Sequence, residues 1–242
     1  MNAIVSDCLF SNCLQVVYPV KGAFGSFAFV TNVMVDCRAI YTTCGSWGEW
    51  SKPEIAHNIF VTSDGQPFIY KNGNHGLTGD GCRIHHNTVV GSTNFIEVAN
   101  TANSPWQPQI FDDLIVLEGG AVFKEKGAGF DGGNTSSFLT GGSAIFWNNV
   151  CLAAGFTAGT ATELPNYDIA NGLAISGNYE LTAAPKFNST DLSSPDFYRP
   201  VKISGAAWTL PGAAWTDDGL YADFIGAKKP SAKKAATFLN AR

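Results

Sequence analysis

Several ionisable residues in the middle of the chain could remove a proton from a carbon next to a carboxylate. Such a reaction needs a base for the proton and positive charge to neutralise the carboxylate. Lys71, His75 and Arg83 are candidates for these two roles. Asp80 and Glu97 are candidate ligands for a metal ion, with calcium as the candidate cofactor. The predicted catalytic set is Lys71, His75, Arg83 and Glu97.

Aromatic and basic residues nearby in the sequence suggest a sugar as the substrate. An aromatic ring packs against the C–H face of a sugar ring, and Arg and Lys pair with carboxylate or sulfate oxygens. The residues that we expect to bind such a substrate are Arg38, Trp47, Trp50, Tyr70, Trp106 and Lys124. The predicted ligand is therefore a polysaccharide, most simply an acidic one.

Two further groups of titratable residues are interpreted as structural. A hydrolase would need two carboxylates about 5–10 Å apart. Asp112 and Asp113 are adjacent, but Asp113 occupies the central position of a recurring phrase described below. His85 and His86 flank the same position in another copy, and we expect one of them to point outward and simply be solvated.

The elements that position these residues follow from a recurring phrase of isoleucine, two variable residues, Asn or Asp, two more residues and an apolar residue. It reads IAHNIFV at 55–61, IHHNTVV at 84–90, IFDDLIV at 110–116, IFWNNVC at 145–151 and ISGNYEL at 175–181. Aligned on the polar residue, the copies are centred on Asp7, Asn32, Asn58, Asn87, Asp113, Asn148 and Asn178. A period of about 25 to 35 residues without helical periodicity predicts a solenoid of β-strands.

Each position of the phrase has a physical reason in such a solenoid. The first and last apolar residues are predicted to point inward and to stack on their copies. The Asn lies at a bend between two strands, where its amide can hydrogen-bond along the stack and where left-handed backbone is tolerated. Asp cannot donate, so Asp rungs should be weaker or should accept from backbone N–H groups.

A second apolar run follows each phrase, as in PFIY at 67–70 and FIEV at 95–98, and is predicted to form the next strand. A longer polar loop follows each run. These strands and loops are expected to form one long face on or beside which Arg38, either Tyr70 or Lys71, Glu97 and Lys124 lie, with the loop tryptophans in the same groove.

With these phrases the chain resembles the right-handed parallel β-helix proteins of the pectate-lyase-like group, which includes polysaccharide lyases, glycoside hydrolases and phage tailspikes. The phrase carries the resemblance, and the closing passages ISGNYELTAAPKF, SSPDFYRP and DGLYADFIGA add to it. The resemblance implies an all-β fold, a right-handed parallel β-helix of about six to seven coils with an extended C-terminal segment. We expect the β-helix over residues 1–200 and the extended segment with a basic tail over 201–242.

The chain departs from this group in two ways. Members usually cap the N-terminal end of the stack with a helix, whereas the first phrase here begins at Ile4. An open end exposes apolar surface and unpaired strand groups, so we expect lost upstream sequence, a protein partner or a second copy to cover it. The catalytic residue patterns of the group are not matched, so the prediction leaves open whether the protein is an enzyme.

Composition narrows the remaining possibilities. The net charge of −5 argues against nucleic-acid binding, and no apolar run approaches the roughly 20 residues of a membrane span. The N-terminus lacks the features of a signal peptide, and an extracellular or virion-surface location is favoured. The six cysteines are interpreted as buried small apolar residues.

Two functions are compatible with these observations. One is a carbohydrate-recognising module, lyase-like or tailspike-like, that could also cleave a polysaccharide. The alternative is a non-catalytic structural or assembly protein of a virion or cell surface.

Overall fold

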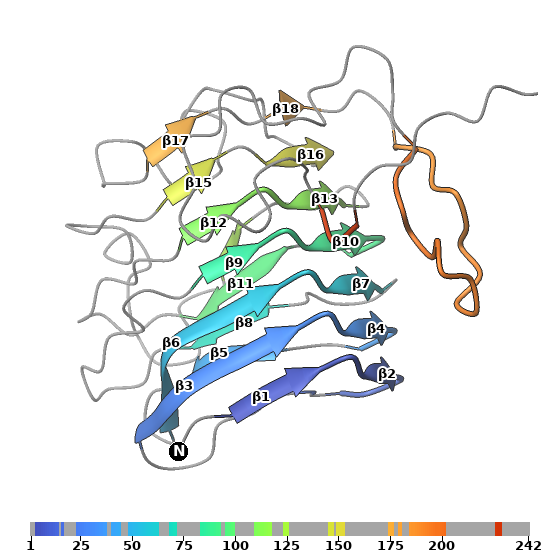
Figure 1. Cartoon of the computed structure of the whole chain (residues 1–242). Helices are drawn as coiled ribbons and strands as arrows, with labels where there is room; N and C mark the ends of the chain where they lie inside the picture. The colour runs from blue at the N-terminus through green and yellow to red at the C-terminus, as the bar shows by residue number, and fades with distance from the viewer. Residues whose placement is uncertain are drawn as a thin grey trace, which may run out of the picture.

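A computed structural model shows an all-β arrangement of parallel strands (Figure 1). It describes residues 3–14, 16, 23–37, 40–44, 48–62, 68–71, 83–92, 95–99, 109–117, 123–125, 145–147, 149–152, 174–176, 179–180, 184–201 and 226–228. Within these ranges the chain forms strands, bends and turns and no helix. Consequently, none of the described segments is a helix that could cross a membrane.

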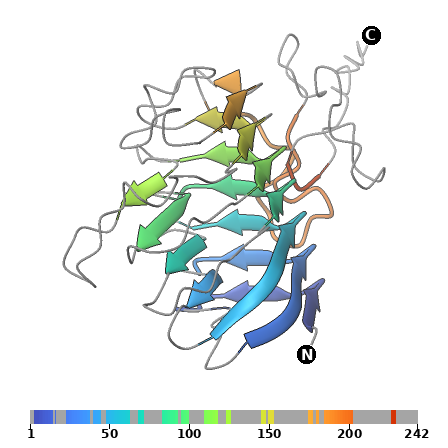
Figure 2. The ribbon, with the colours of Figure 1, turned by 90° about the vertical axis from the view of Figure 1, so that its left-hand side faces the viewer.

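The first ladder of parallel strands takes one strand from each repeat. Its members are β1 (Ala3–Ser6), β3 (Ala23–Val30), β6 (Gly48–Ala56), β9 (Arg83–His85), β12 (Gln109–Phe111), β15 (Ile145–Trp147) and β17 (Ala174–Ser176). A short bend then leads into the second ladder, which comprises β2 (Leu9–Ser11), β4 (Val33–Val35), β7 (Ile59–Val61), β10 (Thr88–Val90), β13 (Leu114–Val116), β16 (Val150–Leu152) and β18 (Tyr179–Glu180). Successive repeats therefore lie one above another (Figure 2).

A third ladder follows the second apolar run of the repeats. It consists of β5 (Ile40–Cys44), β8 (Phe68–Lys71), β11 (Ile96–Ala99) and β14 (Phe123–Glu125), paired in parallel. An antiparallel pairing of β5 with β6 joins it to the first ladder. The expected second strand of each repeat is thus present in four described repeats.

The described part of the core contains two rows of apolar side chains. One row aligns Phe29, Ile55, Ile84 and Ile110, which are at most 1% exposed. The other aligns Met34, Phe60, Val89 and Ile115, at most 2% exposed. Burying each such side chain stabilises the fold by about 1.5–3 kcal/mol relative to leaving it exposed.

In the second ladder, the residues that point inward differ from the sequence prediction, which placed the last apolar residue of each phrase inside. The middle residues of β4, β7, β10 and β13 are buried, whereas the last residues of β7 and β10, Val61 and Val90, are half-buried. The first phrase is also shifted, because Val5 rather than Ile4 pairs with the buried Phe29. Ile4 is 73% exposed.

An amide ladder connects the repeats at the bend between the first two strands. The side-chain oxygen of each polar residue accepts the backbone N–H of the equivalent residue one repeat earlier, at 2.7–3.0 Å. The rungs are Asn32, Asn58, Asn87, Asp113 and Asn149. The Nδ2 of each Asn donates to a carbonyl oxygen of the preceding repeat, namely those of Val5, Phe29, Ile55 and Ile110. The predicted ladder is confirmed for Asn32, Asn58, Asn87 and Asp113.

Two of the predicted rungs are wrong by one residue, and one lies outside the described residues. Asn149, not Asn148, accepts from Asp113, because β12 pairs with β15 so that Ile110 aligns with Phe146. Cys8, not Asp7, donates to Asn32. Asn178 is not among the described residues.

The left-handed backbone conformation belongs to the residue before each rung, not to the rung itself. The residues with this conformation are Asp7, Thr31, His57, His86 and Asp112, with φ between 53° and 59°. We call them the bend row. Asp and His are among the residue types that enter this region more readily than most others.

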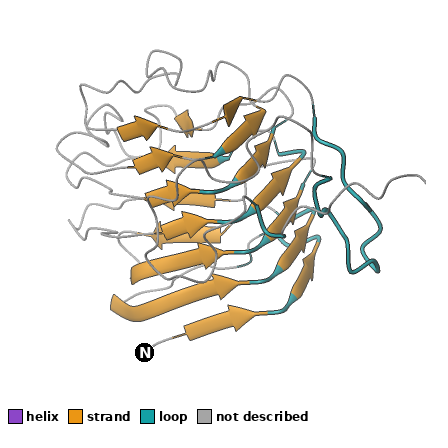
Figure 3. Cartoon of the chain, turned by 45° about the horizontal axis from the view of Figure 1, so that its top comes forward, coloured by secondary structure: helices purple, strands orange, loops and turns teal. Residues whose placement is uncertain are grey.

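A segment near the C-terminus contacts the repeats from outside the ladders. Residues 184–201 lie as a loop beside the second ladder (Figures 1 and 3). The backbone N–H of Gly226 donates to the Asp112 carbonyl at 2.8 Å, and that of Ala227 donates to Thr88 Oγ1 at 2.9 Å. Lys228 Nζ donates to the carbonyls of Pro195 and Phe197, so residues 226–228 connect the loop to the repeats.

The cysteines are only partly buried. Cys37 and Cys151 are buried free thiols, as expected, but Cys8 is exposed and Cys13 is intermediate. Cys44 ends β5, and Cys82 lies outside the described residues.

Asp113 is the acidic rung of the ladder, and its replacement by Asn is expected to stabilise the protein at neutral pH. Burial raises the pKa of Asp113 well above its ordinary value, against the lowering effect of its hydrogen bonds from Asn87. The folded state therefore keeps the proton of Asp113 to higher pH than the unfolded state does. The stability that comes from this proton is fully present below the unfolded pKa of about 4, and it is lost as the pH rises through the folded pKa. The Asp113→Asn variant should lose this dependence and gain about 1–3 kcal/mol near pH 7, measured by urea unfolding from pH 4 to 8.

The matched control is Asn58→Asp, which places a carboxyl at the equivalent rung. This variant should lose stability as pH rises over the same range. If Asp113→Asn is less stable than the parent at every pH, Asp113 is not held as a neutral acid.

Candidate functional site

Four of the ten sugar-binding and catalytic candidates, and the metal candidate Asp80, cannot be assigned a structural role. Those outside the described residues are Arg38, Trp47, His75, Asp80 and Trp106. The backbone positions, without the side chains, are described for Trp50, Tyr70, Lys71, Glu97 and Lys124. Only Arg83 has a described side chain, and its position differs from that of the other candidates.

The third ladder contains four of the candidates. Glu97 on β11 is in register with Lys124 on β14 and with Ile69 on β8. Lys71 pairs with Ala99, and Tyr70 pairs with Val98, on the same two strands. Trp50 lies on β6 opposite Phe24, in the first ladder. The backbone of the predicted face is therefore described at β8, β11 and β14. A groove on this face stays a prediction.

Arg83 lies on β9 in the first ladder, whereas Lys71 lies on β8 in the third ladder. Its backbone pairs with that of Glu54 on β6, and its guanidinium carbon lies 5.6 Å from the centroid of the Phe111 ring. The side chain is partly buried. Arg83 therefore belongs to a second polar region, which contains three histidines.

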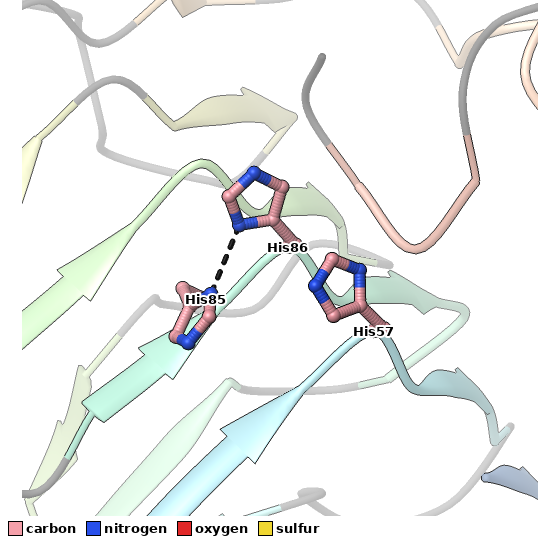
Figure 4. A group of neighbouring side chains, drawn as sticks. All are labelled: His57, His85 and His86. Atoms are coloured by element: carbon pink, nitrogen blue, oxygen red, sulfur yellow. Dashed lines mark hydrogen bonds between the residues drawn. The ribbon is translucent and has the colours of Figure 1, made fainter. Parts of the chain in front are cut away.

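His57, His85 and His86 form the most compact group of possible metal-binding side chains in the described part of the chain (Figure 4). His57 and His86 occupy the bend row in consecutive repeats, after β6 and β9. His85 is the last residue of β9. One ring nitrogen from each of the three lies within 4.8 Å of the others.

The two adjacent histidines contact each other directly. His85 Nδ1 and His86 Nδ1 are 2.9 Å apart, and the ring centroids of His57 and His86 are 4.9 Å apart. His85 and His86 are only 1% and 3% exposed, and His57 is intermediate. The prediction that one of His85 and His86 is simply solvated is therefore wrong.

Neighbouring aromatic packing explains this burial. The ring of His85 stacks on that of Phe111 one repeat later, with centroids 4.7 Å apart and planes within 4°. Phe111 also meets the edge of His86, at 6.4 Å between centroids. An outward strand position can thus be buried when the next repeat carries a large ring at the same position.

Carboxylates contact the far nitrogens of both buried histidines. Glu54 Oε1 is 3.2 Å from His85 Nε2, and Asp112 Oδ2 is 3.8 Å from His86 Nε2. The hydrogen bond with His85 lowers the pKa of Glu54 from its ordinary value, and nearby positive charge adds to this, whereas burial opposes it. Glu54 is therefore a carboxylate at neutral pH and accepts a hydrogen bond from His85 Nε2–H.

The sequence prediction did not place His57 beside His85 and His86. A usable signal was present: aligned on the ladder residues Asn58 and Asn87, His57 and His86 fall at the same position of successive repeats. Neighbouring strands lie about 4.8 Å apart, so such a pair is in contact range. His85 then adds a third imidazole from the adjoining position.

Glu54 is expected to fix the tautomer of His85. In ¹⁵N-labelled protein at neutral pH, long-range ¹H–¹⁵N spectra should show Nε2 protonated and Nδ1 bearing the lone pair, because the carboxylate accepts only from an N–H. The Glu54→Ala variant should show a mixture of tautomers.

The control is Asp196→Ala, which removes the partner of Arg199 at 2.9 Å and should leave His85 unchanged. A wild-type His85 with its proton on Nδ1 would contradict the assignment.

The chain was compared with models of protein families, with curated proteins and with solved structures. None of the three comparisons gives a match. The chemistry of the described residues is therefore the basis of the proposals that follow.

Proposed function

We propose that the three ladders close into a right-handed parallel β-helix and that the protein recognises an acidic polysaccharide along the third ladder. The ladders, the amide rungs and the recurring register support the closed solenoid. The observation that carries the ligand proposal is the ladder β8–β11–β14, whose backbone register aligns Glu97 with Lys124 and Lys71 with Ala99.

The spacing of this ladder suits a linear polymer. Parallel strands repeat about every 4.8 Å, close to the length of one sugar ring in an extended chain. Charged residues on neighbouring strands would then meet successive sugars. Lys71 and Lys124 come from different repeats and would pair with uronate or sulfate groups.

Cleavage is the finer part of this proposal. A lyase would use Lys71, His75 or Arg83 as the base or neutralising cation, with Glu97 or Asp80 holding calcium. Because Arg83 lies in the first ladder beside Glu54, the base is more simply sought at Lys71 or His75.

The polysaccharide proposal predicts binding that depends on the two lysines. Polygalacturonate and alginate should bind the full chain, and Lys71→Ala or Lys124→Ala should weaken binding about twofold to fivefold, because each removes one ion pair with the ligand. Affinity would be measured by calorimetry at low and high salt, since added salt screens such contacts. Absorbance from new unsaturated ends, with and without calcium, would report cleavage.

Lys186→Ala is the matched control, because Lys186 is exposed and lies in the segment near the C-terminus. Its affinity should equal that of the wild type. If the panel shows no binding, polysaccharide recognition is wrong; if it binds without new absorbance, only the lyase step is wrong.

The second candidate function is assembly, and it has its own observation. β1 and β2 end their ladders among the described strands, so one edge of each has unpaired backbone groups. Ile4 and Leu9 on these strands are 73% and 56% exposed, and Leu14 is 66% exposed. Unpaired strand edges with apolar side chains readily pair with another chain. We propose a second copy of this chain as the occupant.

Assembly predicts a dimer or larger oligomer in solution that depends on this edge. Ile4→Glu or Leu9→Glu should shift the mass measured by light scattering toward the monomer, because each buries a charge in the interface. Leu192→Glu, at a position that is 44% exposed, is the control. A monomeric wild type at high concentration would rule out this interface.

A further inference from the structure

We propose that His57, His85 and His86 bind a divalent first-row transition-metal ion, with Zn²⁺ as the reference ion. The site is separate from the third ladder, and the proposal does not depend on polysaccharide binding. It rests on the type of donor atoms, on the groups that orient them and on the surrounding charge.

The donor set selects the class of ion. Three imidazole nitrogens within 4.8 Å of one another suit zinc, copper, nickel or cobalt, whereas calcium and magnesium prefer oxygen ligands. Three histidines leave the fourth position of a tetrahedral ion open for water or another small ligand.

One carboxylate is hydrogen-bonded to His85, and a second carboxylate lies near His86. Glu54 accepts from His85 Nε2, and Asp112 lies beside His86 Nε2. A proton on each Nε2 leaves both Nδ1 atoms with lone pairs, and these atoms are 2.9 Å apart. A proton on one Nδ1 makes this contact a hydrogen bond, and a metal ion that takes the place of this proton would be bound by both lone pairs. Metal-bound histidines are commonly oriented by a carboxylate on the other ring nitrogen.

The charge of the surroundings favours a cation. The carboxyl groups of Glu54 and Asp112 lie 3.2 Å and 3.8 Å from ring nitrogens of His85 and His86, so acidic groups flank two of the three imidazoles. His85, His86 and Asp112 are each at most 3% exposed, so solvent screens this charge weakly.

Only a small rearrangement is needed to close the site. Nitrogens bound to one tetrahedral zinc at 2.0–2.1 Å lie about 3.3 Å apart. The separation of 2.9 Å between the two Nδ1 atoms is already near this value, and the widest separation in the group is 4.8 Å. His57, the least buried of the three, can supply the remaining movement by rotating its ring.

The first experiment titrates metal into the full chain after chelator treatment and dialysis. Competition with a chromophoric chelator should give one equivalent of Zn²⁺, and Co²⁺ should give a visible spectrum of a nitrogen-ligated ion without a thiolate charge-transfer band. The spectrum matters because the chain also has free thiols at Cys8, Cys13, Cys37 and Cys151. A thiolate band would assign the ion to those residues and overturn the proposal.

The second experiment uses substitutions that the fold accepts. His57→Asn and His86→Asn keep a residue type that tolerates the left-handed bend, and His85→Phe repeats the ring that Phe111 presents one repeat later. Each should lower Zn²⁺ affinity at least tenfold while leaving the far-ultraviolet circular dichroism unchanged. Glu54→Ala should lower it about tenfold through lost orientation of His85.

Asp7→Asn is the matched control, since Asp7 lies in the same bend row two repeats before His57 and should bind metal like the wild type. The proposal is overturned if the wild type takes up no ion at micromolar free metal, or if folded histidine variants keep wild-type affinity. In the first case the close contact of His85 and His86 holds a proton. Polysaccharide binding can succeed or fail independently of either result.

Discussion

The structure depends on one requirement: polar groups buried at the bend of every repeat must find hydrogen-bond partners. The side-chain oxygen of one rung accepts the backbone N–H of the rung before it, and the amide nitrogen donates to a carbonyl of the same earlier repeat. An unmet buried donor or acceptor costs about 1–3 kcal/mol, so few side chains other than an amide suit this position. Because the rung residue faces inward, the residue before it must turn the chain, and the bend row is the consequence.

The sequence predicted the repeating architecture well and its register less well. Asn32, Asn58 and Asn87 stand in clear phrases, and their rungs are as predicted. At 145–151 two adjacent asparagines fit the phrase equally, and in the first repeat both Ile4 and Val5 could begin it. A shift of one residue exchanges the two faces of a strand, and only pairing with neighbours decides between them. This pairing involves two repeats, so the sequence of one repeat alone does not determine the register.

The histidine group shows why sites are harder to predict than folds. Strand alternation correctly places His85 away from the apolar rows, but exposure also depends on what the next repeat carries at that position. The ring of Phe111 covers that of His85, and the residues around position 85 do not predict this contact. The carboxylates come from the same neighbours, with Glu54 one repeat earlier and Asp112 one later. The region is thus assembled from three phrases, each unremarkable alone.

The hydrogen bond between Ala227 and Thr88 spans 139 positions of the sequence. In a stack where each repeat otherwise touches only its neighbours, stability spreads locally and the ends can fray independently. The segment near the C-terminus bonds to two middle repeats, through Ala227 to Thr88 and through Gly226 to the Asp112 carbonyl. These bonds join distant parts of the sequence into one cooperative unit. Because synthesis starts at the N-terminus, residues 226 and 227 are made long after the repeats that they contact. The hydrogen bonds from Gly226 and Ala227 to the middle repeats can therefore form only after the segment around residue 226 has been made.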